Sequence, residues 1–61
     1  MPPRDYNYKI VAVTKSGDIE EWLAESVSWK SAHAIYEIET KEWPTRRIEL
    51  RYRARVLNQS Y

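Results

Sequence analysis

The stretch Arg47-Ile48-Glu49-Leu50-Arg51-Tyr52-Arg53-Ala54-Arg55-Val56 decides the fold. Apolar or aromatic residues alternate in it with charged ones, which is the two-residue period of a β-strand that has one buried face. The stretch therefore predicts a single strand of about ten residues. One face of this strand belongs to the core, and the other carries a row of arginines, which we call the arginine stripe: Arg47, Arg51, Arg53 and Arg55.

Two further strands are predicted near the start of the chain. Residues 6–14 are rich in aromatic and β-branched side chains, and they are apolar on both faces, as expected of a central strand. Residues 15–18 contain the sole glycine, Gly17, and predict a hairpin turn. The following stretch, Ile19–Ser26, carries several acidic side chains and predicts an edge strand, with Trp22 and Ala24 on one face.

An amphipathic helix is predicted over Trp29–Glu42. Ser28 can cap its first turn, and Pro44 prevents its continuation. A helical period places an apolar arc on one side of this segment, made of Trp29, Ala32, Ile35, Tyr36 and Ile38. We expect this arc to lie on a sheet.

The order strand, strand, helix, strand predicts one α+β domain of ββαβ topology over residues 6–57. Short connections make the three strands antiparallel in the order 2-1-3, with the helix on one face. Residues 1–5 are expected to be a disordered lead and residues 58–61 a polar tail. The uncovered sheet face would display Lys9, Val11 and Val13, flanked on one side by the arginine stripe and on the other by Glu21, Leu23 and Glu25.

Size and composition restrict what the chain can be. It has 61 residues and no cysteine, so one domain without disulfides or thiolate metal sites is expected, stabilised by packing alone. Large aromatic side chains are then expected in the core: Trp22, Trp29, Trp43 and Tyr36. Tyr6 and Tyr8 share one strand face, and their register favours core burial over a role in base stacking.

The formal net charge of +1 conceals a segregated distribution. Residues 18–42 hold seven acidic side chains against two lysines, and residues 43–61 hold five arginines against one glutamate. Charge of this kind either pairs internally or is presented to a partner. The first residues lack the apolar core of a signal peptide, and no apolar run could span a membrane, so we expect a cytoplasmic protein.

Catalysis is not expected. His33, the sole histidine, lies on the polar side of the predicted helix one turn before Glu37, where a solvated surface pair is the simplest interpretation. Two such residues cannot complete a metal site, and one glycine cannot form a phosphate-binding loop. The sequence therefore predicts neither an enzyme nor a cofactor.

The arginine stripe is the strongest candidate for a binding surface. Guanidinium groups match carboxylate and phosphate oxygens, so three interpretations stay open: a solvated or internally paired face, a protein partner, or nucleic acid. The low net charge weighs against nucleic acid. The predicted partner-binding set is Arg47, Arg51, Arg53, Arg55, Lys9, Val11, Val13 and Leu23, the last three forming an exposed apolar patch.

Three segments carry a resemblance in layout: Trp29-Lys30-Ser31-Ala32 at the start of a helix, Tyr36-Glu37, and Trp43-Pro44-Thr45-Arg46-Arg47-Ile48-Glu49-Leu50-Arg51. With its strand-strand-helix-strand order, the chain resembles small orphan accessory proteins of bacteriophages. The resemblance implies a protein that binds and modulates or inhibits a host protein or defence complex in the host cytoplasm. Homodimerisation through the open face and a structural role in a larger assembly are alternatives.

Overall fold

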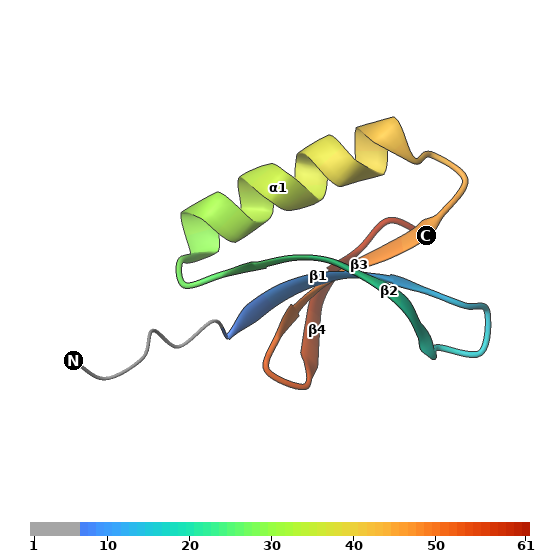
Figure 1. Ribbon diagram of the computed structural model, residues 1–61, viewed down its shortest axis with the longest axis horizontal. Helices are drawn as coiled ribbons and strands as arrows, with labels where there is room; N and C mark the ends of the chain where they lie inside the picture. Colours follow the sequence, from blue (N-terminus) through green and yellow to red (C-terminus); the bar gives the residue numbers. More distant parts are fainter. Residues whose placement is uncertain (1–6) are drawn as a thin grey trace.

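The computed structural model describes residues 7–61 and arranges them as one helix packed on one sheet (Figure 1). Residues 1–5, expected to be a disordered lead, lie outside the described residues. The elements in chain order are β1 (Tyr8–Val13), β2 (Ile19–Ser26), α1 (Trp29–Glu42), β3 (Arg47–Tyr52) and β4 (Arg55–Gln59). The sheet is antiparallel, with strand order β2-β1-β3-β4. The α+β class and the central position of β1 between β2 and β3 are confirmed.

The prediction of three strands is wrong, because the long alternating stretch folds back on itself. β3 ends at Tyr52, and a two-residue turn at Arg53 and Ala54 leads into β4, which pairs with β3 in antiparallel register. Arg53 has a φ of 57°, in the left-handed region where glycine or asparagine is usual. The sequence has neither residue there, so it gives no turn signal. β4 also includes Asn58 and Gln59, which the sequence assigns to a polar tail.

The first hairpin forms as predicted. Gly17 has a φ of 91°, and the backbone N–H of Thr14 donates to the carbonyl of Asp18 at 2.9 Å, which closes the turn. The register between β1 and β2 shifts twice, first between Ile10 and Val11. These shifts change the expected faces only in the middle of β2, around Trp22, because each extra residue moves the side chains that follow it to the other side of the sheet, while Ala24 and Glu25 keep the expected faces.

Helix α1 has the predicted bounds and caps. The side chain of Ser28 accepts a hydrogen bond from the backbone N–H of Ser31 at 3.2 Å, and the N–H of Trp43 donates to the carbonyl of Glu39 at 3.0 Å. The helix packs against β1, β2 and β3. Its buried Ala32 meets three aliphatic side chains of the sheet, Ile10, Ile48 and Leu50, and these four residues form the core.

None of the three tryptophans lies in this core, contrary to expectation. Trp22, Trp29 and Trp43 are each about half exposed, with 54%, 46% and 46% of their surface accessible, and Ile38 of the predicted apolar arc is exposed as well. One helix on one sheet leaves a thin core that small and branched side chains already fill. Tyr36 is half-buried against the core as expected, and burial raises the pKa of its hydroxyl.

Candidate protein interface

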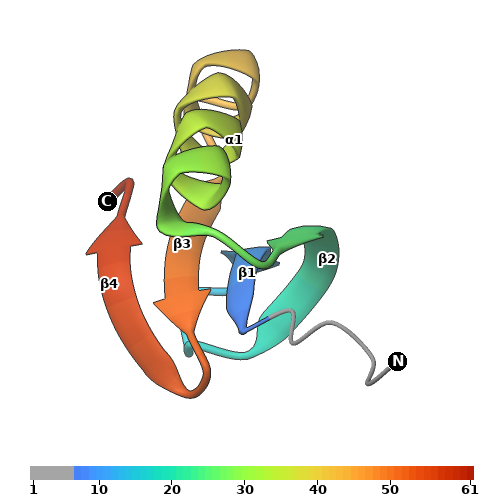
Figure 2. The same cartoon turned by 90° about the vertical axis from the view of Figure 1, so that its left-hand side faces the viewer.

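The sheet face opposite α1, here called the open face, is covered by no second layer of secondary structure from the described residues 7–61. Figure 1 shows both hairpin tips bending away from α1, and Figure 2 shows β4 and β2 at the two sides of the sheet. Residues paired across antiparallel strands share a face. The register therefore places on the open face Lys9, Val11, Val13, Ile19, Trp22, Glu25, Arg47, Glu49, Arg51, Val56 and Gln59.

The exposed apolar patch predicted for this face does not exist. Val11 is 0% exposed and Val13 4% exposed, although both point away from the helix. Their neighbours across the strands are long side chains, Trp22 and Glu49 beside Val11, and Arg47 beside Val13. These side chains and the bend of the sheet cover both valines, which thus form a second small apolar layer.

Leu23, the third member of the predicted patch, lies on the other side of the sheet. It packs against the helix-side core together with Ala24. The register shift opposite Ile10 and Val11 explains this change, because it brings two successive residues of β2 toward the helix and turns Trp22 to the open face.

A buried carboxylate organises the centre of the open face. Glu49 is almost fully buried, and its Oε1 accepts a hydrogen bond from Nε of Arg51 at 2.8 Å and lies 2.7 Å from Nη2 of the same guanidinium. The hydroxyl of Tyr61 donates to the other carboxylate oxygen. This hydrogen bond, followed by desolvation, raises the pKa of Tyr61 above its ordinary value. Arg51 therefore forms an ion pair within the chain.

Two cation–π pairs flank this carboxylate. The ammonium group of Lys9 lies 5.0 Å from the ring centroid of Trp22, and the guanidinium of Arg47 lies 4.5 Å from that of Tyr61. Each ring is about half exposed. Each pair thus presents an aromatic surface and a positive charge together, in an orientation that the contact restricts.

The arginine stripe is not a continuous feature of one strand face. Arg53 lies in the turn, with its guanidinium 5.6 Å from the ring centroid of Tyr52. Arg55 begins β4 directly opposite Tyr52, on the helix side of the sheet. Only Arg47 and Arg51 remain on the open face, because the turn removes the last two arginines from the alternation.

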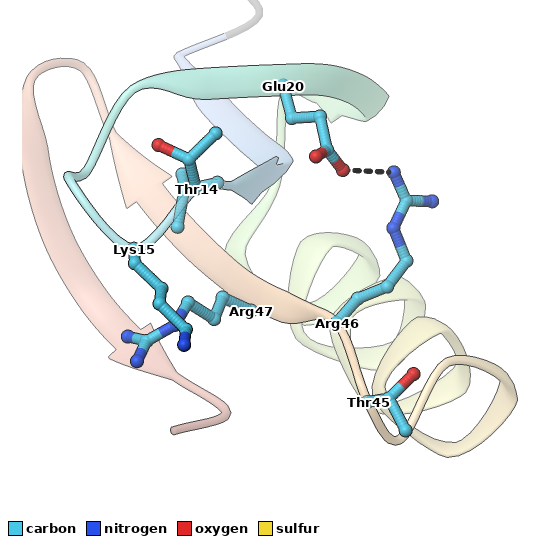
Figure 3. Close-up of a pocket in the computed structure, with 7 residues that line it drawn as sticks. Thr14, Lys15, Glu20, Thr45, Arg46 and Arg47 are labelled. Atoms are coloured by element: carbon cyan, nitrogen blue, oxygen red, sulfur yellow. Dashed lines mark hydrogen bonds and ion pairs between the residues drawn. The ribbon is translucent and has the colours of Figure 1, made fainter.

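A basic cleft of about 400 Å³ opens at the end of the sheet near the first hairpin (Figure 3). Lys15, Arg46 and Arg47 line it with Glu20. The Nη2 atom of Arg46 lies 3.1 Å from a carboxylate oxygen of Glu20 and 2.7 Å from one of Glu21, hydrogen bonds that raise the pKa of the guanidinium. The acidic β2 edge thus neutralises one of the three cations.

Residues 7–61 offer little support for catalysis by His33 or for metal binding. The ring of His33 lies tilted beside that of Trp29, with centroids 5.1 Å apart, and its Nδ1 lies 3.8 Å from a carboxylate oxygen of Glu37. Within the described part of the chain, no three histidine or carboxylate side chains are grouped to hold a metal ion. No helix in residues 7–61 has the length and apolar character required to cross a bilayer.

Sequence reasoning missed the aromatic members of the open face. The sequence predicts Trp22 in the core and Tyr61 in a polar tail. The sequence offered one usable signal for Tyr61, a large aromatic residue that ends an otherwise polar segment. Comparison with protein-family models, curated proteins and solved structures finds no match to this chain.

Proposed function

We propose that this chain is a small non-enzymatic protein-binding module that docks through the open face. The observation that carries the proposal is the pair of aromatic–cation contacts, Lys9 with Trp22 and Arg47 with Tyr61, on a face that no other element of residues 7–61 covers. Tryptophan, tyrosine and arginine are enriched among the residues that dominate binding energy at protein interfaces.

The surroundings of these pairs support the same function. Ile19 and Val56 add exposed apolar surface at the two sides of the open face. The ion pair of the buried Glu49 with the partly exposed Arg51 lies between them and holds Tyr61 through its hydroxyl. Side chains that are oriented before binding lose less conformational entropy when a partner docks.

Nucleic acid is the second candidate, favoured by the basic cleft at Lys15, Arg46 and Arg47. The open face carries few cations for a phosphate backbone, because Arg51 is paired with Glu49 and two arginines of the predicted stripe lie elsewhere. Nucleic-acid binding surfaces are usually strongly basic, so this distribution favours a protein partner.

The partner we propose is a host protein whose binding surface combines acidic groups with an apolar centre. Acidic groups would meet Lys9 and Arg47, neither of which takes part in an ion pair among residues 7–61. An apolar centre would contact the indole of Trp22. A host partner is also what the resemblance to phage accessory proteins implies.

The test is a capture experiment from host lysate with the wild type and two charge-matched variants. The first variant, Lys9→Glu with Arg47→Glu, reverses the cations of the open face. The second, Lys30→Glu with Lys41→Glu, makes the same charge change on exposed positions of α1. Each capture is run with and without nuclease, and circular dichroism verifies that the variants are folded.

We expect a specific set of proteins to be retained by the wild type and by the helix variant, with or without nuclease, and to be lost from the open-face variant. Loss of capture after nuclease treatment supports the nucleic-acid alternative instead. Equal capture by both variants contradicts the assignment of the open face.

A further inference from the structure

The outer edge of β4 is exposed, and binding of a partner to the open face does not account for this. Among residues 7–61, β4 pairs with β3 on one side and no strand lies on its other side. Helix α1 packs on the other three strands, and no Cα atom of α1 lies within 8 Å of one in β4. Four of its five residues are exposed, including the apolar Val56 and Leu57.

The two edges of the sheet differ in how they are protected. The outer edge of β2 carries the carboxylates Glu20, Glu21 and Glu25 and has two register irregularities, both of which discourage pairing with another strand. Along β4, charge is confined to Arg55 at its start, and the strand contains neither proline nor glycine. One register shift interrupts it, near Leu57. An edge of this kind is open to strand addition.

The backbone of β4 offers hydrogen-bonding groups on that side. Arg55 closes the two-residue turn opposite Tyr52, and the N–H of Ser60 donates to the carbonyl of Ile48 at 2.9 Å, so both residues direct their backbone groups toward β3. Backbone groups alternate in direction along a strand. Those of Val56 and Gln59, each next to an inward-directed residue, therefore point outward.

We propose that β4 pairs with β4 of a second copy of this chain, in antiparallel orientation around a two-fold axis near Leu57. Val56 of one copy then lies opposite Gln59 of the other. The result is one continuous sheet of eight strands, a size that open sheets commonly reach. The contact runs along about 17 Å of strand, and the open faces of both copies become one surface.

Charge and shape favour a second copy of this chain over a foreign peptide as the strand that pairs with the β4 edge. Antiparallel pairing places Arg55 at opposite ends of the contact in the two copies, so the like charges stay apart. A foreign peptide added to an edge gains specificity from pockets beside the strand. The cleft found in this structure is lined by residues of the first hairpin, the segment before β3 and its first residue, and by none of β4. Two identical edges need no such pockets, because each edge supplies the complement of the other.

The test measures molar mass as a function of concentration by sedimentation equilibrium. The wild type is expected to shift from 7.3 kDa toward twice that mass as the concentration rises. Leu57→Lys places two ammonium groups near the two-fold axis and should weaken association by about tenfold or more. The matched control is Ile19→Lys on the β2 edge, because Ile19 and Leu57 are 36% and 37% exposed. This control should associate like the wild type.

Hydrogen exchange of the wild type gives a second readout that does not depend on a variant. The amide protons of Val56 and Gln59 should become protected as concentration rises, while those of the β2 edge should not. A wild type that stays monomeric up to millimolar concentration overturns the proposal. So does dissociation caused by Ile19→Lys but not by Leu57→Lys, or association lost in the open-face variant Lys9→Glu with Arg47→Glu.

Discussion

The left-handed conformation of Arg53, in the turn between β3 and β4, predicts that glycine at this position stabilises the protein relative to alanine. Its φ of 57° places its Cβ close to the backbone, which costs a residue other than glycine about 1–2 kcal/mol. Arg53→Gly removes that cost. The comparison variant is Arg53→Ala, which keeps the Cβ but, like glycine, loses the guanidinium over the ring of Tyr52. The cation–π contact therefore cancels between the two variants.

Two opposing contributions determine how much the stability of the glycine variant differs from that of the alanine variant. Relief of the left-handed conformation favours the glycine variant by about 1–2 kcal/mol, and the larger conformational freedom of glycine in the unfolded chain opposes it by about 0.5–1 kcal/mol. We expect the glycine variant to be more stable than the alanine variant by about 1 kcal/mol. In a domain of this size that difference raises the midpoint of thermal unfolding by about 4–8 °C.

Thermal unfolding followed by circular dichroism, with urea unfolding as a second measurement, decides the outcome. A single strand running from Arg47 to Val56 would place position 53 in a strand interior, where glycine is less stable than alanine by about 0.5–1 kcal/mol. The hairpin and the single strand therefore predict opposite signs for the difference in stability between the glycine and alanine variants. An alanine variant more stable than the glycine variant would refute the hairpin.

Two further predictions concern the centre of the open face. Glu49→Gln removes the charge of the buried carboxylate that pairs with Arg51 and should lower the free energy of unfolding, measured by urea titration, by about 2 kcal/mol. The control is Glu25→Gln, on the same face but exposed, which should change the free energy of unfolding by less than about 0.5 kcal/mol. Equal effects of the two changes would argue against a structural role for Glu49. Tyr61→Phe tests the raised pKa of Tyr61. The folded state holds the phenolic proton more tightly than the unfolded chain, so the stabilisation is complete below pH 10.0 and is lost as pH rises through the folded pKa. Thermal unfolding across this range should show the difference between wild type and Tyr61→Phe shrinking above pH 10.0, and a difference that persists there would contradict the hydrogen bond to Glu49.

Much of the fold could be predicted from local sequence signals. Ser28 and Pro44 delimit the helix because one supplies a capping oxygen and the other cannot continue it. Gly17 marks the first turn because it adopts a positive φ without strain. β1 is recognisable as the central strand because both of its faces are buried, which excludes charge from most of its length.

The candidate interface was less predictable, since its members depend on register. A β-bulge adds one residue without changing the composition of a strand, so alternation alone could not place Trp22 on the open face or Leu23 in the core. Val11 and Val13 were predicted to be exposed because they lie opposite the helix. They are buried because side chains from the neighbouring strands cover them.

The sequence by itself determined the α+β class, the helix, the first hairpin and the central strand, because each of these depends on residues close together in the chain. Only the tertiary structure decided that the arginine stripe breaks at Arg53 and that β4 forms an edge. It also brought Tyr61 to Glu49 and Arg47. These features arise from contacts between distant segments, in which pairing with β3 outweighs the local cost of a left-handed arginine. The alternation in residues 47–56 was a correct signal for strand structure, but it carried no information about where the chain turns.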